Sequence, residues 1–510
     1  MAHKLINFDS TQKQRTIMIR RQLYGMGLIC ACFVLSFTTI TTAQVKDLAY
    51  YYSQCPFKMP VVTEPLFADK SFNIKDYGAV ADNQTLNTKA FADAITACSN
   101  AGGGKVIVPA GTWLTGPIQM QSNVNLVVEQ DALIQFTKDH TQYPIVKASN
   151  TSTSYVPASP IYGYDLQNIA ITGAGKIDGA GDSWRPVKKQ KVSSDEWNRL
   201  RASGGVVSDD GKIWWPSREA IDGEAYMKKL KKEGGKPGPE AYLPARDFNR
   251  PYMVFFVNCN NVLLEGVTIR NSPKFVFYPN SCTNLTMRSV NIYNDWWAQN
   301  GDGIDISACK NVVIYKCTVN AGDDGICMKA STKKGESGPV TQNILIAGNT
   351  VLRAHGGFVI GSNTDGGMQD IFVDDCNFTG TDAGIRVKSN PGRGGLVKNI
   401  YITNIKMKDI KGEAVVFETQ YEDMPAGKTK GDDENANDKI PQFTEFYISN
   451  ITCLGAKKAI SITGLPEMPI TKINFENVNI SADEGYENRN TSEINFKSVK
   501  LSTPNGVKKY

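Results

Sequence analysis

The most constraining feature of this 510-residue chain is a short motif that recurs along most of its length. Each copy has a polar residue, usually asparagine, followed by alternating apolar residues, as in Asn261–Leu264 and Asn311–Ile314. Further copies begin at Asn168, Asn284, Asn343, Ile371, Asn399, Phe446 and Ile473. Most copies follow one another at about 23 to 29 residues, with longer intervals where loops are inserted.

This spacing predicts a solenoid of short parallel strands, an all-β single-stranded parallel β-helix. A propeller is the competing fold, but it needs four strands in each repeat of roughly 40 to 50 residues. In a β-helix, alternate residues point inward and equivalent residues of neighbouring coils stack about 4.8 Å apart. The recurring asparagines are therefore expected to form a structural ladder in the turns rather than to bind a ligand.

A second set of segments carries the chemistry. Asn300–Ile306 and Gly322–Lys329 both place a carboxylate and a glycine before an alternating strand, and His355–Ile360 and Asp382–Lys388 fit the same frame. The frame aligns one glycine from each segment: Gly303, Gly325, Gly357 and Gly384. The interior positions are then Ile304, Ile306, Ile326, Met328, Phe358, Ile360, Ile385 and Val387, and the outward ones are Asp305, Cys327, Val359 and Arg386.

Neighbouring coils would present six polar side chains together: Asp302, Asp323, Asp324, His355, Arg386 and Lys388. Asp302 and Asp324 stack, and Asp323 is displaced by one residue. Three carboxyls this close cannot all ionise at low cost, so the pKa of at least one should rise and leave a general acid. An inverting glycosidase uses one such acid and one base, about 6.5 to 9.5 Å apart.

Simpler interpretations exist for each residue type. Asp-Gly pairs are common in turns, clustered carboxylates bind calcium, and single histidines or surface cations are often only structural. The presence of Arg386, Lys388 and His355 in one frame with the acids favours catalysis on an anionic polymer.

Composition excludes several classes of site. The net charge of +5 is spread along the chain, so no nucleic-acid-binding stripe is expected. Two of the eleven cysteines lie in the apolar leader, and Cys259, Cys282 and Cys309 share one repeat position, which indicates buried ladder positions rather than disulfides. With three histidines in the whole chain, a structural zinc site is not expected.

The N-terminus resembles an export signal. Arg20 and Arg21 precede the apolar stretch Leu23–Phe37, and small residues end at Ala43, so residues 1–43 are predicted to be a signal peptide of an exported, periplasmic or extracellular protein. The apolar stretch is short for an anchoring helix, so no integral span is expected after its removal. Residues 44–71 are expected to lead irregularly into the fold, and a helix over Thr88–Cys98 to cap the first coil.

Two segments depart from the repeat. Ser183–Arg250 is predicted to be a long loop insertion beside the groove, with helices over Asp195–Arg201 and Glu219–Lys232. It carries four tryptophans whose faces would suit sugar rings: Trp184, Trp197, Trp214 and Trp215. Residues 422–438 form a highly charged loop that is expected to be mobile. The rest of residues 72–510 is expected to form one catalytic domain.

Four short motifs resemble the signatures of the polygalacturonase family of glycoside hydrolases: Asn300-Gly301-Asp302, Gly322-Asp323-Asp324, Ala354-His355-Gly356 and Arg386-Val387-Lys388. The flanking repeats extend this resemblance from about Phe72 to Ile480. Gly301, Val387 and Ala354 stand where Thr, Ile and Gly are usual in the family.

The resemblance implies a right-handed β-helix, no metal or other cofactor, and inverting hydrolysis of α-1,4-linked galacturonic acid. It implies that Asp323 is the general acid, that Asp302 and Asp324 hold and activate water, and that His355 orients the acid. Arg386 and Lys388 would grip the substrate carboxylate, and Asn300 would support the site.

The signatures and the long insertion resemble bacterial members that release sugars from chain ends, which favours a monomeric exopolygalacturonase. Its partner would be a polysaccharide, either pectin or galacturonan oligosaccharides. Other classes stay open at this point: a hydrolase of rhamnogalacturonan or another decorated pectin, a calcium-dependent pectate lyase, and a non-catalytic polysaccharide-binding solenoid.

Overall fold

The structure is a computed structural model that describes residues 46–331, 339–420 and 439–510. The predicted signal peptide and the charged loop over residues 422–438 lie outside the described residues. Within the described ranges, every helix is too short or too polar to cross a membrane.

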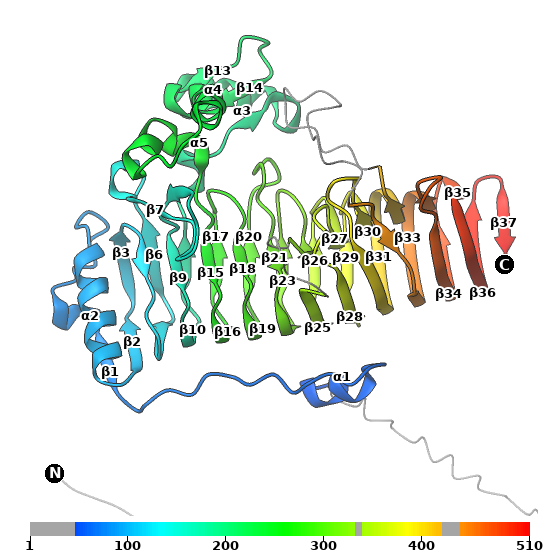
Figure 1. The fold of residues 1–510 in the computed structure, drawn as a ribbon, viewed down its shortest axis with the longest axis horizontal. Helices are drawn as coiled ribbons and strands as arrows, with labels where there is room; N and C mark the ends of the chain where they lie inside the picture. The colour runs from blue at the N-terminus through cyan, green and yellow to red at the C-terminus, as the bar shows by residue number, and fades with distance from the viewer. Residues whose placement is uncertain (1–45, 332–338, 421–438) are drawn as a thin grey trace, which may run out of the picture. The chain divides into compact units, whose positions relative to one another are not determined.

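Parallel strands between β2 and β36 stack in successive coils and pair in three ladders (Figure 1). The first ladder contains β2 (Gly104–Val108), β5 (Val124–Val128), β10 (Gln167–Gly173), β16 (Asn260–Glu265), β19 (Thr283–Arg288), β22 (Lys310–Tyr315), β25 (Thr341–Ala347) and β28 (Met368–Asp374). The second contains β3 (Gly111–Thr115), β6 (Ala132–Phe136), β11 (Lys176–Asp178), β17 (Thr268–Arg270), β20 (Asn291–Tyr293), β23 (Thr318–Asn320), β26 (Thr350–Leu352) and β29 (Asn377–Thr379).

The third ladder carries the candidate site. It contains β4 (Ile118–Gln119), β9 (Ile161–Tyr164), β15 (Val254–Val257), β18 (Phe277–Asn280), β21 (Ile304–Ser307), β24 (Ile326–Lys329), β27 (Gly356–Ile360) and β30 (Ala383–Lys388). Towards the C-terminus the ladders merge into long bent strands: β31 (Leu396–Glu418), β33 (Phe446–Thr463), β34 (Ile470–Ser481) and β36 (Thr491–Thr503). The predicted parallel β-helix is therefore confirmed.

The register of the third ladder matches the frame expected from the glycines. Ile304 pairs with Ile326, Ile326 with Phe358, and Phe358 with Ile385. All eight predicted interior side chains belong to the buried core. Asp305, Cys327 and Val359 lie outside that core as expected, but they too are buried, because other groups cover the outer face: the Lys329 ammonium lies 3.0 Å from an Asp305 oxygen and 3.4 Å from the Cys327 sulfur.

The predicted asparagine ladder runs along the turn before the first-ladder strands. Asn261, Asn284, Asn311 and Asn343 each donate a side-chain hydrogen bond of 2.9 to 3.2 Å to the preceding rung. Every one of these residues has a left-handed backbone with φ between 55° and 59°. Asparagine tolerates this conformation better than other non-glycine residues, so one residue type fixes both the turn and the register.

The cysteines follow a similar rule. Cys259, Cys282 and Cys309 stack in the core, where the Cys259 and Cys282 amides each donate to the next sulfur at 3.4 Å. All nine cysteines of the described residues are free thiols.

At the N-terminal end, α2 (Thr88–Asn100) packs Phe91, Ala94 and Ile95 into the core and caps the first coil, as predicted. The expectation of an irregular segment over 44–71 was wrong for α1 (Leu48–Gln54). Tyr51 from this helix packs on apolar residues on the outer face of the first ladder, including Val313 and Leu345.

The insertion has its own small core. Its helices are α3 (Ser194–Ala202) and α4 (Arg218–Glu233), close to the predicted bounds, and β12 (Val187–Lys188), β13 (Val206–Val207) and β14 (Ile213–Trp215) form a small antiparallel sheet. Trp197 and Trp214 are buried against Val187, and Trp184 stacks on His140 at 3.5 Å. Three of the four tryptophans therefore stabilise the insertion, and only Trp215 lines a cavity that sugar could enter.

Asn284→Ala should lower the free energy of unfolding by about 2 kcal/mol, because alanine is strained at positive φ and leaves neighbouring amides unpaired. Asn284→Gly relieves the strain and should lose about half as much. Urea unfolding would measure both variants against Asn291→Ala, which removes an exposed asparagine from β20. Equal effects of Asn284→Ala and Asn291→Ala would contradict a structural role for the ladder.

Candidate active site

The three aspartates and the histidine lie just before consecutive strands of the third ladder. Asp302 precedes β21, Asp323 and Asp324 precede β24, and His355 precedes β27. Gly325 allows the coils to approach here, since a Cβ at that position would lie 2.6 Å from a Val351 methyl carbon and 2.9 Å from the Gly356 carbonyl oxygen. In-register stacking thus brings together side chains that are up to 53 residues apart in sequence.

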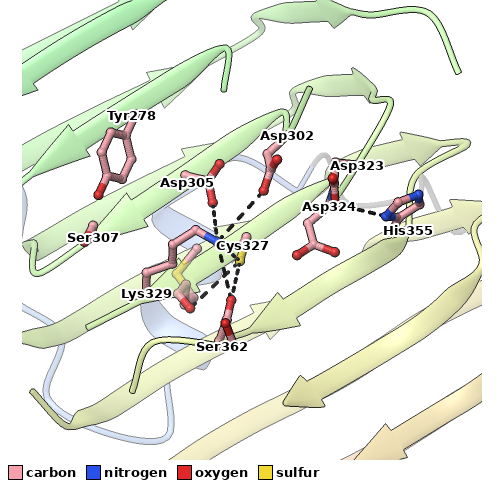
Figure 2. A network of polar contacts seen from close by, with 12 residues as sticks. Tyr278, Asp302, Asp305, Ser307, Asp323, Asp324, Cys327, Lys329, His355 and Ser362 are labelled. Atoms are coloured by element: carbon pink, nitrogen blue, oxygen red, sulfur yellow. Dashed lines mark hydrogen bonds and ion pairs between the residues drawn. The ribbon is translucent and has the colours of Figure 1, made fainter. Parts of the chain in front are cut away.

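The acids form one compact cluster, drawn in Figure 2. One carboxylate oxygen from each of Asp302, Asp323 and Asp324 lies within 4.8 Å of the others. His355 Nδ1 lies 2.9 Å from Asp323 Oδ1, so the histidine reaches the acid cluster as the motif resemblance implied. Asp302 and Asp324 are 3% and 2% exposed, whereas the Asp323 side chain keeps 21% of its surface accessible. The predicted site residues are therefore assembled in one place.

Lys388 holds the innermost carboxylate. Its Nζ donates to Asp324 Oδ2 at 2.8 Å, and both side chains are buried. Burial alone would raise the pKa of Asp324, but the charges of Lys388 and Arg386 outweigh burial and hold that pKa below its usual range. Arg386 pairs in register with Val359, and its stem lies beside Gly356. Both predicted substrate cations thus act on Asp324.

The pKa values of the other two acids are pushed apart. Burial, reinforced by the charges of Asp305 and Asp323, raises the pKa of Asp302 well above its usual range, and Asp302 Oδ1 has no hydrogen-bond partner among the described residues. Burial would also raise the pKa of Asp323, but the hydrogen bond from His355, the charge that this ring carries when it is protonated, and the charge of Lys388 make the pKa lower than usual. The expected rise in one pKa is therefore present, and it falls on Asp302.

A buried ion pair extends the cluster beyond the site residues that were predicted from the sequence (Figure 2). Lys329 Nζ lies 3.0 Å from Asp305 Oδ1 and 3.9 Å from Asp302 Oδ2. Burial raises the pKa of Asp305 to about 6 despite this lysine. Both residues lie in the motif segments, but the repeat predicts only that Asp305 points outward, because it does not show that this face is covered.

Arg250 is a second residue that sequence reasoning missed. Its guanidinium donates to Asn300 Oδ1 at 2.9 Å and to the Gln299 carbonyl oxygen at 2.9 Å. Asn300 is therefore held in place by the last residue of the insertion. Burial and the charge of Arg185 lower the pKa of Arg250 to about 10. The only sequence signal was its place at the boundary between insertion and coil.

A cavity of about 670 Å³ is lined by most of these site residues, but not by Asp305 or Arg386. Four acidic side chains line it, against seven basic ones: Lys188, Lys191, Arg250, Lys274, Lys329, Lys388 and Arg393. Burial and the nearby Arg250 lower the pKa of Lys274 to about 8. Crowded cations of this kind are relieved by an anionic ligand.

The cluster has the groups needed for acid-base hydrolysis. Its three carboxylates are also close enough to ligate a cation. However, Lys388 already occupies one oxygen of Asp324 and His355 one oxygen of Asp323. This donor set favours proton transfer at the acids over metal binding.

The comparisons with known proteins agree with this geometry. A probable polygalacturonase of Vitis vinifera is 27% identical over 423 residues, covering 80% of this chain and 74% of the relative. The exo-poly-alpha-D-galacturonosidase of Dickeya chrysanthemi is 28% identical over 458 residues, covering 87% of this chain and 72% of the relative. The structure of a hyperthermoactive exopolygalacturonase from Thermotoga maritima aligns with a TM-score of 0.68 at 28% identity, covering 85% of this chain and 94% of that chain.

Two family profiles match. One, described as rhamnogalacturonase A/epimerase, pectate lyase-like, matches residues 71–195. The other, glycosyl hydrolases family 28, matches residues 240–503, which is more than half of the chain and includes every site residue named above except Lys188 and Lys191. The chain therefore belongs to glycosyl hydrolases family 28, and it is a glycoside hydrolase with a parallel β-helix fold.

Proposed function

We propose that this enzyme hydrolyses α-1,4-galacturonosyl linkages in pectin or polygalacturonate, acting at chain ends with inversion. The observation that carries the proposal is the cluster of three carboxylates in a cavity lined mainly by cations. A neutral polysaccharide would bring no carboxylate to these cations, whereas each galacturonate residue supplies one. Relatives named as polygalacturonases support the same substrate class.

The proposed roles follow the geometry. Asp323, the most accessible of the three acids, protonates the leaving oxygen, and His355 orients it. Asp302 and Asp324 hold the attacking water. A water makes hydrogen bonds of about 2.8 Å, so oxygens within 4.8 Å of one another can share one water. This spacing is closer than the roughly 6.5 to 9.5 Å expected of an inverting pair, so the proposal of inversion rests on the motif resemblance and not on the carboxyl separation. Arg386 and Lys388 bind the uronate at the reacting subsite.

Substrate binding would also favour a proton on the Asp323 carboxyl group. In the structure the raised pKa belongs to Asp302, whereas a general acid needs a proton on Asp323. A uronate that draws Lys388 towards itself removes positive charge from the acids and adds negative charge beside them. Both changes raise the pKa of Asp323. The anionic substrate thereby favours the protonated form of its own general acid.

The insertion supports action at chain ends. Ile213, Trp215 and Glu224 line the same cavity as the catalytic acids, so the insertion forms part of the cavity wall. A wall beside the reacting subsite limits how many sugar units can extend past it. We also propose that residues 1–43 direct export, that residues 72–510 form the catalytic domain, and that the enzyme works as a monomer.

A decorated pectin is the second candidate substrate. It is favoured by the match of residues 71–195 to the profile described as rhamnogalacturonase A/epimerase, pectate lyase-like. Rhamnogalacturonan alternates neutral and acidic sugars, so it would use fewer of the cavity cations than polygalacturonate does.

Asp323→Asn should lower kcat on polygalacturonate by about a thousandfold or more, because asparagine cannot supply the proton. Reducing-end release by the mature chain in the presence of a chelator measures this. Asp76→Asn, an exposed change on the N-terminal cap, should keep full activity. An Asp323→Asn enzyme with more than a tenth of the normal rate would exclude Asp323 as the general acid.

Product sizes test the mode of action. With polygalacturonate, mono- or digalacturonate should appear from the first minutes while the viscosity of the solution falls slowly. The ultraviolet absorbance should stay constant, because hydrolysis forms no double bond. Early oligomers of mixed length would indicate internal cleavage. Rising absorbance would indicate a lyase, and turnover of rhamnogalacturonan alone would indicate the second substrate.

Asp302→Asn should abolish activity and yet stabilise the fold at neutral pH. The pKa of Asp302 is higher in the folded than in the unfolded chain, so its contribution to stability is complete below the unfolded value of about 3.9 and is lost as pH rises through the folded value. Asparagine resembles the protonated acid at every pH. The thermal midpoint of the variant should match wild type at pH 4 and exceed it at pH 7.5. A gain that is the same at both pH values would contradict the raised pKa.

A further inference from the structure

A lysine of the insertion reaches the histidine that contacts the proposed acid. Lys191 ends a short 3₁₀ turn over Lys189–Lys191, and its Nζ lies 2.9 Å from His355 Nε2. On the other side of the ring, His355 Nδ1 lies 2.9 Å from Asp323 Oδ1. The three side chains therefore form a continuous chain of contacts from the insertion to the catalytic cluster.

The chemistry of these contacts fixes the form of the ring. A lysine ammonium has three donors and no acceptor, so His355 Nε2 must accept from it and carries no proton. The single ring proton is then on Nδ1, where it is donated to the Asp323 carboxyl. The ring is neutral in this arrangement, and both of its nitrogens are used.

We propose that Lys191 is a positioning residue for the reaction: it occupies the lone pair of His355 Nε2 and keeps the ring neutral, so that His355 orients Asp323 without forming an ion pair with it. An imidazolium 2.9 Å from Asp323 would hold this residue as a carboxylate, which cannot donate a proton. The neutral ring orients the same oxygen through one hydrogen bond and leaves the acid free to be protonated when substrate binds.

The surroundings explain why the lysine is needed. Asp382 Oδ2 lies 3.8 Å from His355 Nε2 and would favour a second ring proton. Lys411 offsets this carboxylate only partly, at 3.7 Å from the other Asp382 oxygen, and its Nζ also lies 3.9 Å from the centre of the Trp296 ring. Trp296 packs edge-on against His355, with ring centres 6.0 Å apart.

Lys191 itself is held where it can act on the ring. Its Nζ lies 4.9 Å from the centre of the Trp296 ring. Burial and the charges of Lys188 and Lys411 act to lower the pKa of Lys191, against the charges of Asp323 and Asp382, and the net shift is downward. Other charged groups that act on Asp323 belong to the site described above: Asp302, Asp305, Asp324, Arg250 and Lys388.

Nitrogen-15 NMR of the imidazole rings tests the proposal directly. After removal of residues 1–43 the chain has two histidines, His355 and His140, if it is prepared without a histidine tag. His140 contacts Asp247 and Ser183 in the insertion region and serves as an internal reference. Wild type should show His355 with a protonated Nδ1 and an unprotonated Nε2 at pH 6.

Lys191→Met removes the donor but keeps an aliphatic stem beside Trp296. His355 Nε2 should become protonated in this variant, while the His140 signals stay unchanged. Lys191→Arg, which still has only donors, should keep Nε2 unprotonated. Unprotonated Nε2 in Lys191→Met, or protonated Nε2 in wild type, would overturn the proposal.

Kinetics separate positioning from substrate binding. Lys191→Met should lower kcat by about ten- to a hundredfold with little change in KM, and move the alkaline limb of the pH profile down by about half a unit to one unit. Lys191→Arg should restore most of kcat, and Lys189→Met on the same turn should resemble wild type, because Lys189 lies over Trp197 instead. A higher KM with unchanged kcat would make Lys191 an ordinary substrate cation and overturn the proposal.

The kinetic part rests on the proposed role of Asp323 as general acid, whereas the NMR part does not. If Asp323→Asn keeps its activity while the ring behaves as expected, the proposed function fails and the assigned form of His355 stands. If Asp323→Asn is inactive and the ring does not respond to Lys191→Met, the further inference fails alone.

Discussion

In-register stacking of parallel coils is the constraint on which both the fold and the site depend. Each coil repeats the position of the one before, so Asp302, Asp324 and Gly356 lie on adjacent rungs. The asparagine ladder fixes this register, since a slip of one residue would turn Asp305 into the core. The catalytic cluster is therefore a direct product of the repeat, and its precision comes from the core beneath it.

The cost of stacking acids is offset by two lysines and a hydrogen-bond donor. Lys388 pairs with Asp324, Lys329 pairs with Asp305, and His355 donates to Asp323. Within the described residues, Asp302 has only the more distant Lys329 ammonium at 3.9 Å, and burial raises its pKa well above the usual range. One carboxyl group of the cluster thus lacks a close cation, in the site where the proposed reaction needs a proton that can be transferred. Such local departures from complete pairing are typical of functional sites.

The parts of the structure that follow the repeat could be predicted from the sequence, and the parts that do not follow it could not. Aligning four glycines predicts the stacking period and the interior residues. It also predicts that four polar residues meet: Asp302, Asp323, Asp324 and His355. The α1 helix was missed because irregular, proline-rich flanks hid the spacing of Leu48, Tyr51 and Cys55. Arg250 and Lys191 were missed for another reason: the insertion has no period, so its sequence does not show which side chains return to the groove.

The insertion connects two properties that could otherwise change independently. Trp215 of the insertion forms part of the cavity wall. Another part of the insertion, the turn next to the core around Trp197 and Trp214, places Lys191 against His355. A change in the insertion that widened the cavity would therefore also move the ammonium that caps the histidine. Under the proposed mechanism, the reach of the enzyme along its polymer and the protonation of its acid would then vary together, even if the β-helix and its three aspartates stayed the same.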